Sequence, residues 1–366
     1  MSNQLIHSIN LAAETIVKID GSYGEGGGQI FRTSLALSAI LKRPLEIFNI
    51  RVGRREPGLK PQHLMSANAT AAVTGGRLEG AALNSQALNF FPGYIVSGRY
   101  NFDVASIKAS AGATGLIFQT IVPVLSFADG SSDISITGGT HVAWSPPADY
   151  LREVFIPVVS KTGLDINITV LKYGFYPIGG GKVDIKVKPC SKPLNPIRFF
   201  ERGNIKRVSI MSAVANLPLS IAERQRDRAV KTLQLANCKV QSEIKEVPSS
   251  GKGTFLFILA EFENINAGFI GLGAIGKRAE TVADEAVDEF MQYWRGDGAL
   301  DPHLADQIVL YMALAKGNSS FTTTRITNHL LTNIWVIEKF LPVKFEVKGN
   351  IGEEGIVLVS GIGLSR

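Results

Sequence analysis

The sequence predicts a mixed α/β (α+β) fold, with a large domain and a smaller inserted α/β domain. Short β-type runs alternate with helical runs along the chain. Its 366 residues exceed the usual size of one domain. Three prolines in residues 189–196 interrupt the alternation as a linker would. We therefore expect residues 1–200 and 299–366 to form the large domain and residues 201–298 the insert.

The first half of the chain predicts helices separated by short strands. Apolar residues at helical spacing predict helices at 29–41, 61–75, 112–127 and 148–161. Runs of β-branched and aromatic residues predict strands at 15–19, 45–50, 77–79, 89–91, 132–137, 166–171 and 182–188. This rhythm suggests units of roughly 70 to 80 residues, each with helices on one face of a small sheet.

The second half predicts a self-sufficient α/β set and then one more unit of the first type. The set has expected strands at 206–214, 239–246 and 255–262 and helices at 219–235 and 279–295. The last unit has expected helices at 304–315 and 328–340 and strands at 320–324, 343–348 and 355–360. An inserted domain is the economical interpretation.

The composition is that of a globular protein: 45% of residues are hydrophobic, 19% are charged and 37 are glycines. No apolar run reaches membrane-spanning length, and the N-terminus lacks a basic then apolar signal pattern. The two cysteines, Cys190 and Cys238, suit a reducing compartment. We expect a cytoplasmic protein with no membrane partner.

The charge balance favours a polyanionic partner. The formal net charge is +6 and the pI is about 9.2. Arg51, Arg54, Arg55 and Lys60 cluster around a Pro-Gly pair. A solvated basic loop would give the same pattern, so both interpretations stay open.

A glycine-rich segment, residues 20–32, is the strongest local signal. Its glycines let an anion approach the main-chain amides, and the N-terminus of the helix expected next favours negative charge. Glu25 is expected to hold a divalent cation that bridges phosphate oxygens, with Arg32 neutralising the remaining charge. Phosphate with a metal is the functional interpretation, and a structural turn is the alternative.

Five histidines are present: His7, His63, His141, His303 and His329. His329 begins an amphipathic helix after a strand, where its side chain can enter a cleft, although a surface histidine near a helix cap fits as well. His7 and His141 look incidental. Zinc, calcium and P-loop spacings are absent, so any nucleotide chemistry must use another frame. A transient Mg²⁺ or Mn²⁺ bound with a nucleotide stays open.

With these features in view, the chain resembles the RNA 3′-terminal phosphate cyclases. The resemblance covers nearly the whole chain, in segments 20–32, 50–63, 110–120, 138–149, 174–181, 201–204, 304–307 and 329–333. It implies a large domain of three repeated βαβαββ units with the inserted α/β domain. It also implies a ligase that uses ATP to adenylate a histidine, passes AMP to an RNA 3′-phosphate, and closes a 2′,3′-cyclic phosphodiester, releasing pyrophosphate and AMP.

The resemblance also implies roles for single residues. His329 would be the nucleophile and Glu25 the metal-binding carboxylate, and Arg32 and Arg54 would complete the set of four catalytic residues. Phosphates of the RNA end or the nucleotide would be held by Arg32, Arg51, Arg54, Gln62 and His63, with the division among the arginines left open. The nucleotide pocket would contain Gln119, Pro146, Tyr150, His303, Leu304, Ala305, Asp306 and Gln307. The expected partner is an RNA 3′-phosphate end, and a homodimer is left open.

Two rival functions remain at this point. One is a non-catalytic relative that binds RNA or a ribosome-assembly partner, against which the presence of His329 argues. The other is a carboxyvinyl transferase of related architecture acting on phosphoenolpyruvate. Structural interpretations also stay open for Pro146-Pro147, for the glycine triplet at Gly179 and for the turn at 201–204.

Overall fold

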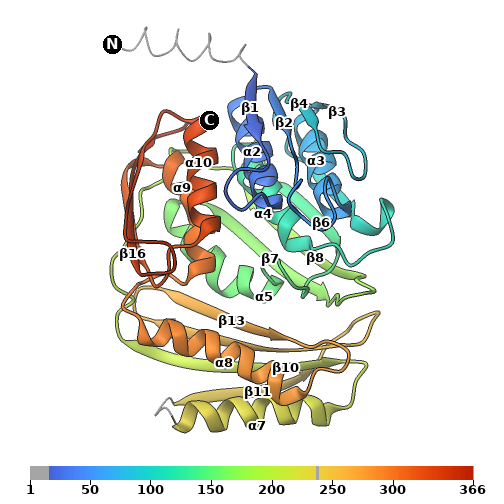
Figure 1. Ribbon diagram of the computed structural model, residues 1–366, viewed down its shortest axis with the longest axis vertical. Coiled ribbons are helices and arrows are strands. Elements are labelled where there is room, and N and C mark those ends of the chain that lie inside the picture. Colours follow the sequence, from blue (N-terminus) through green and yellow to red (C-terminus); the bar gives the residue numbers. More distant parts are fainter. Residues whose placement is uncertain (1–15, 236–238, 366) are drawn as a thin grey trace.

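The computed structural model describes residues 16–235 and 239–365. Residue 15, His7 and Cys238 lie outside this part of the chain. Within it, the strands form four four-stranded sheets covered by helices (Figure 1). The prediction of a mixed α/β fold is confirmed.

The first sheet has the strand order β1-β2-β4-β3. Strands β1 and β2 are parallel because helix α2 crosses between them, and the other neighbours are antiparallel. The elements are β1 (Val17–Asp20), α2 (Gly28–Leu41), β2 (Leu45–Phe48), α3 (Pro61–Thr74), β3 (Arg77–Glu79) and β4 (Leu88–Phe91).

The second sheet repeats this arrangement in the order β5-β6-β8-β7. Its strands are β5 (Arg99–Asp103), β6 (Ser132–Gly138), β7 (Asp165–Lys172) and β8 (Gly181–Lys188). Its helices are the short η1 (Val104–Ser106), α4 (Thr114–Leu125) and a continuous stretch of α5 (Ala148–Tyr150), η2 (Leu151–Phe155), α6 (Ile156–Val159) and η3 (Ser160–Thr162).

The third sheet has the order β9-β14-β16-β15, again with one parallel and two antiparallel pairs. Its elements are β9 (Arg198–Phe199), α9 (Pro302–Leu314), β14 (Lys316–Thr323), α10 (Asn328–Phe340), β15 (Phe345–Lys348) and β16 (Gly355–Ile362). Three sheets therefore share one strand order and one set of strand directions, which is the pattern expected of a βαβαββ unit.

The fourth sheet lies between β9 and α9 in the sequence and has the order β11-β10-β12-β13. Its elements are β10 (Ile205–Ala215), α7 (Leu219–Leu235), β11 (Val240–Glu246), β12 (Gly253–Phe262), β13 (Asn266–Leu272) and α8 (Ala279–Arg295). In Figure 1 it lies at the end of the molecule opposite β1, and a separate apolar cluster packs its helices on its strands. The expected boundaries at 201 and 298 stay a prediction.

Three strands differ from the sequence expectation. β5 and β13 were not expected, and Arg198-Phe199 was interpreted as following a linker. Instead, Arg198 and Phe199 pair in parallel with Ser320 and Phe321 of β14. The third sheet thus begins before the insert and is completed after it.

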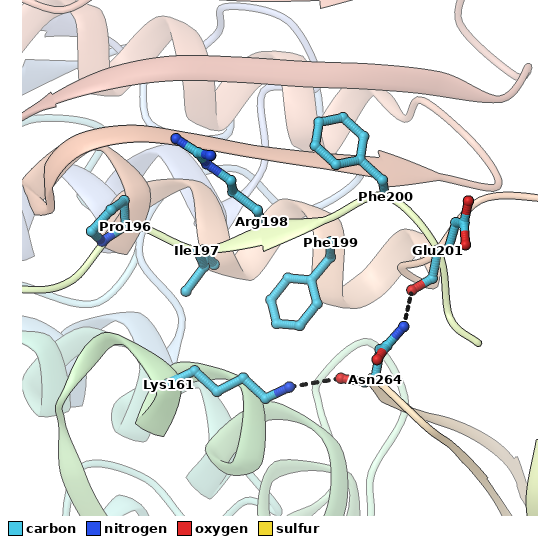
Figure 2. Close-up of a pocket in the computed structure, with 8 residues that line it drawn as sticks. All are labelled: Lys161, Pro196, Ile197, Arg198, Phe199, Phe200, Glu201 and Asn264. Carbon is cyan, nitrogen blue, oxygen red and sulfur yellow. Dashed lines mark hydrogen bonds between the residues drawn. The ribbon is translucent and has the colours of Figure 1, made fainter. Parts of the chain in front are cut away.

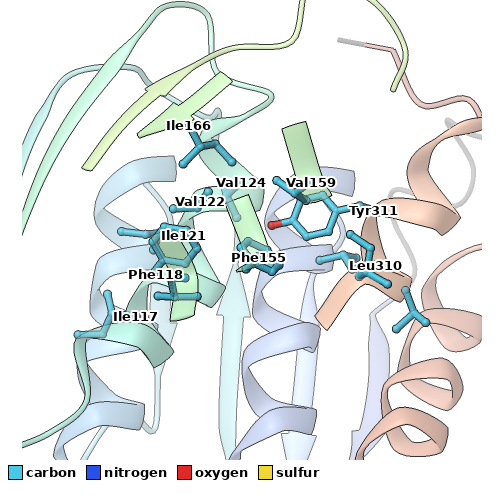
Figure 3. Close-up of a cluster of buried hydrophobic side chains, with 14 of the residues drawn as sticks. Ile117, Phe118, Ile121, Val122, Val124, Phe155, Val159, Ile166, Leu310 and Tyr311 are labelled. Carbon is cyan, nitrogen blue, oxygen red and sulfur yellow. The ribbon is translucent and has the colours of Figure 1, made fainter. Parts of the chain in front are cut away.

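The helices of the three similar units share one apolar core. Figure 3 shows three aromatic side chains among buried aliphatic ones: Phe118 of α4, Phe155 of η2 and Tyr311 of α9. The ring centroids of Phe118 and Phe155, and of Phe155 and Tyr311, are both 5.8 Å apart. Helix α10 packs against both α2 and α9, so side chains distant in sequence can meet at the ends of these helices.

Candidate active site

Glu25, Arg54 and His329 form a contiguous cluster. Nε2 of His329 lies 2.6 Å from Oε2 of Glu25, and Nη2 of Arg54 lies 2.5 Å from Oε1 of the same carboxylate. Nη2 of Arg54 also donates to the main-chain oxygen of Glu25 at 3.1 Å. The cluster joins the loop after β1, the loop after β2 and the first turn of α10, so it includes three of the four residues predicted to be catalytic.

The local sequence fixes both sides of this cluster. Thr327 caps α10 by accepting a hydrogen bond from the Leu330 N–H, which sets the turn that carries His329. Gly24 has φ +56°, and a side chain there would collide with the Thr332 hydroxyl. That hydroxyl accepts a hydrogen bond of 3.3 Å from the Glu25 N–H. The glycine therefore lets the first loop contact α10 directly.

The electrostatics of His329 follow from these contacts. The hydrogen bond that His329 donates to Glu25 is the largest influence and raises the pKa of His329, although partial burial opposes it. The partners His329 and Arg54 lower the pKa of Glu25 against the opposing effect of burial. Both shifts favour the charged forms, an imidazolium beside a carboxylate.

His63 and Arg32 lie beside this cluster, around Gly28. A Cβ atom on Gly28 would lie 2.8 Å from Cδ2 of His63 and 2.9 Å from Nη1 of Arg32. Nδ1 of His63 accepts a hydrogen bond of 3.1 Å from the Lys60 N–H, so the neutral ring carries its proton on Nε2. Burial, followed by the charge of Arg32, holds the pKa of His63 well below its usual value. His63 is therefore a neutral donor beside a guanidinium, a combination suited to phosphate oxygens.

Arg51 and Gln62 make structural contacts. Nη1 of Arg51 donates to the main-chain oxygens of Glu56 and Gly58, at 3.0 and 2.9 Å. Oε1 of Gln62 accepts a 3.4 Å hydrogen bond from the Ala113 N–H. These contacts order the basic loop and tie α3 to the second unit. Their predicted roles in phosphate binding stay predictions.

A cavity of about 40 Å³ lies between α2, α4, α9 and α10. Its lining includes Arg32 and the predicted pocket residues Gln119, Asp306 and Gln307. Burial lowers the pKa of Arg32 to about 10 and raises that of Asp306 to about 6. Oε1 of Gln307 is a buried acceptor without a hydrogen-bond partner among the described residues. Such an orphaned acceptor fits a ligand that brings its own N–H donor.

The other predicted pocket residues lie around the first turn of α9. The Tyr150 hydroxyl donates to Oδ1 and Oδ2 of Asp301, at 3.0 and 3.1 Å, so it supports the helix from inside the protein. Leu304 and Ala305 are fully buried, which leaves their side chains out of reach of a ligand. The side chain of His303 is exposed to solvent. The main-chain oxygen of Pro146 lies against Gly115 of α4.

Two residues that sequence reasoning missed complete the scaffold. Asp301 caps α9 by accepting hydrogen bonds of 2.9 Å from the His303 and Leu304 N–H groups. Asn333 donates to the main-chain oxygen of Asp306 at 2.7 Å and accepts from the Thr33 hydroxyl at 2.8 Å. An Asp-Pro pair before an apolar helical run is a cap signal that could have revealed Asp301.

Glu25, the one carboxylate of this cluster, does not by itself make a metal site. In the described residues, no group of three or more His, Cys, Asp or Glu side chains could hold a metal ion. Both oxygens of Glu25 already contact cationic partners. Mg²⁺ commonly binds through one carboxylate together with phosphates and water. Glu25 therefore fits a cation that arrives with a nucleotide, and does not fit a protein-only cage.

A wider cavity, of about 460 Å³, lies elsewhere, beside β9 (Figure 2). Lys161, Phe199 and Phe200 line it, and Asn264 of the insert accepts a 2.7 Å hydrogen bond from Nζ of Lys161 at its edge. None of the predicted site residues lines this cavity. It marks the junction of the insert with the rest of the protein and not the cluster around His329.

Comparisons with known proteins agree on one family. The family model described as RNA 3′-terminal phosphate cyclase matches residues 23–347. A protein of that name from Pyrobaculum neutrophilum is 42% identical over 350 residues, covering 95% of this chain and 99% of its own. Another from Methylococcus capsulatus is 41% identical over 350 residues, covering 95% and 97%.

Two further findings are more general. The solved structure of an enolpyruvyl transferase, NikO from Streptomyces tendae, matches with a TM-score of 0.40 and 10% sequence identity. The match covers 96% of this chain and 49% of the NikO chain, and the likeness is too weak to support an argument. None of the described helices is both long and apolar enough to span a membrane. The family match over nearly the full length, on a chain that brings Glu25, Arg54 and His329 together, shows that this chain belongs to the RNA 3′-terminal phosphate cyclase family.

Proposed function

We propose that this protein converts an RNA 3′-terminal phosphate into a 2′,3′-cyclic phosphodiester, using ATP and a covalent histidine-AMP intermediate. The observation that carries the proposal is the contact between Nε2 of His329 and Glu25, flanked by Arg54. A protein that only binds RNA has no need for a nucleophile paired with a proton acceptor. Family membership supports the substrate class.

His329 is the nucleophile of the first step. Its pKa is raised by Glu25, so Nε2 must give up a proton before it can attack. Oε2 of Glu25, 2.6 Å away, would accept that proton. The bond from Nε2 to the α-phosphorus of ATP then forms as the bond to the pyrophosphate oxygen breaks.

The surrounding cations stabilise the charge that this step develops. Arg54 contacts Glu25 directly, and Arg32 lies beside the cavity in which Gln119, Asp306 and Gln307 would receive the nucleotide. A divalent cation bound with ATP would neutralise charge on its phosphates, and Glu25 is the carboxylate that would hold it. Glu25 would therefore serve in turn as proton acceptor for His329 and as cation ligand, because a protonated carboxylate holds a cation poorly.

The second and third steps use the RNA end. An oxygen of the 3′-phosphate attacks the phosphorus on His329, and the Nε2–P bond breaks to leave an RNA-adenylate. The 2′-hydroxyl then loses its proton and attacks the 3′-phosphorus, which releases AMP and closes the ring. The neutral Nε2–H of His63, together with Arg32 and Arg54, would hold the 3′-phosphate during both steps.

Labelling with α-labelled ATP tests the proposal. Wild-type protein incubated with Mg²⁺ or Mn²⁺ is expected to carry acid-labile, alkali-stable label, and His329→Ala to carry none. Asn328→Ala is the matched control, because Asn328 is the exposed neighbour of His329 on α10. Wild-type protein that stays unlabelled with either metal would overturn the histidine-AMP route. The cytoplasmic location and the homodimer stay predictions.

A further inference from the structure

Trp144 has a position that folding does not explain. It is a central residue of the turn from Val142 to Ser145, and its φ is +64°. This left-handed region suits glycine or asparagine and strains a bulky side chain. Its side chain is also 97% exposed. A tryptophan side chain is thus held in water on a backbone conformation that disfavours it. Strained, exposed residues of this kind point to a functional role.

The turn beneath Trp144 is held in place. Val142 packs in a small buried cluster with Ala111, Ala113 and Leu116. The side chains of His141 and Asp149 are fully buried beneath it, with Nε2 and Oδ2 2.9 Å apart. The exposure of Trp144 is therefore a property of an ordered loop and not of a loose one.

A second exposed ring lies in the adjoining loop. The N–H groups of Thr140 and His141 both donate to the main-chain oxygen of Gly174, at 3.0 Å. Two residues beyond Gly174, Tyr176 is 80% exposed. Two aromatic rings thus project into solvent from two loops that are hydrogen-bonded to each other.

These loops lie at the same end of the second sheet as the candidate phosphate and nucleotide residues. Pro146 is two positions after Trp144, and Ala113 pairs with Gly139 and donates to Gln62. Two further segments contact the Tyr176 loop: Ser110 and Ala111 lie against Gly179, and Gly251 lies against Ile178. Lys108 and Lys252, which belong to these two segments, are exposed and form no ion pair among the described residues. Exposed rings with uncompensated cations are the chemistry that binds single-stranded nucleic acid.

We propose that Trp144, with Tyr176 in the adjoining loop, is a stacking platform for bases of the RNA upstream of its 3′-phosphate. This inference rests on the proposed function and adds to it where the body of the RNA lies. Stacking on a ring tolerates any base, so the platform favours longer single strands without selecting a sequence.

The test compares a dinucleotide and an octanucleotide, both with a 3′-phosphate. Trp144→Ala is expected to weaken binding of the octanucleotide about tenfold, the order that stacking of one base on an aromatic ring supplies. The same variant is expected to leave self-adenylation and turnover of the dinucleotide near wild type. Trp144→Phe is expected to restore most of the loss. Ile275→Ala, which removes another fully exposed apolar side chain, in the insert, is the matched control.

Tryptophan fluorescence gives a readout independent of activity. The octanucleotide is expected to quench wild-type emission, and Trp144→Phe is expected to lose most of that quenching. Equal loss of self-adenylation and octanucleotide binding in Trp144→Ala would assign the ring to the adenine of ATP and overturn the inference. Unchanged octanucleotide binding, or a changed oligomeric state of Trp144→Ala in sedimentation, would also overturn it. Failure of the proposed function would show differently, as wild-type protein that takes no label.

Discussion

Gly28 is the position where one added methyl group should damage the candidate site most directly. It is the first residue of α2, and its missing side chain leaves room for His63 and Arg32. In Gly28→Ala, the new Cβ would lie 2.8 Å from Cδ2 of His63 and closer still to Nε2. Real Cβ contacts are essentially never below 3.0 Å, so the ring must move. The Lys60 N–H holds Nδ1 of His63 by a hydrogen bond, and the rings of Phe31 and His63 pack in a T-shaped arrangement with an angle of 83° between their planes.

Two opposing effects set the size of the change. Alanine is favoured over glycine in a helix by up to about 1 kcal/mol, and by less at the first position. Overpacking a filled, buried site costs about 1–3 kcal/mol. Because His63 is 4% exposed and anchored at Nδ1, we expect the clash to outweigh the gain in helix propensity. The net loss of unfolding free energy should be about 1–2 kcal/mol, which lowers Tm by roughly 1–3 °C in a protein of this size.

The assay combines thermal unfolding with the two half-reactions. Gly28→Ala is expected to lose transfer of AMP to RNA at least tenfold, because the donors expected to hold the phosphate are displaced. Gly53→Ala is the matched control, since nothing lies within 4 Å of a Cβ at that position in the neighbouring basic loop. We expect its Tm and activity to match wild type or slightly exceed it. A Gly28→Ala protein with wild-type Tm and transfer rate would refute this account of the site.

Three other changes test separate parts of the structure. Glu25→Gln should lower the pKa of His329, because the carboxylate that raises it is gone. In a plot of adenylation rate against pH, the acid limb should therefore move to lower pH while the maximal rate falls. An unmoved limb would contradict the pairing. Tyr150→Phe should lower the unfolding free energy measured by chemical denaturation by about 1.5–3 kcal/mol, because the buried carboxylate of Asp301 loses its hydroxyl donor. A loss below about 0.5 kcal/mol would argue against that role. Arg54→Ala should impair transfer to RNA more than self-labelling in a radiolabel assay, and equal losses would reject that division.

The sequence predicted the elements whose patterns are strong and local. Helices α7, α8 and α10 begin and end at the predicted residues, because their apolar positions recur at helical spacing. β5 was missed because only Phe102 of its five residues is buried. β9 is two residues long and depends on pairing with β14, far along the chain. Short strands set by distant partners leave little local signal.

The candidate site divides in the same way. Motifs at Glu25, Arg54 and His329 indicated that these residues act together, and the structure places them in contact. No pattern in the sequence could show that Tyr150 uses its hydroxyl on Asp301, because that contact spans 151 positions. Long-range hydrogen bonds follow from the fold and not from local spacing.

The candidate site draws on both ends of the polypeptide. The Glu25 N–H and the Thr332 hydroxyl meet across 307 positions, and the insert is translated between them. A nascent chain that still lacks α10 holds the glycine-rich loop without its nucleophile. On the proposed function, a chain that has not yet been translated through α10 therefore cannot charge itself with AMP or consume ATP.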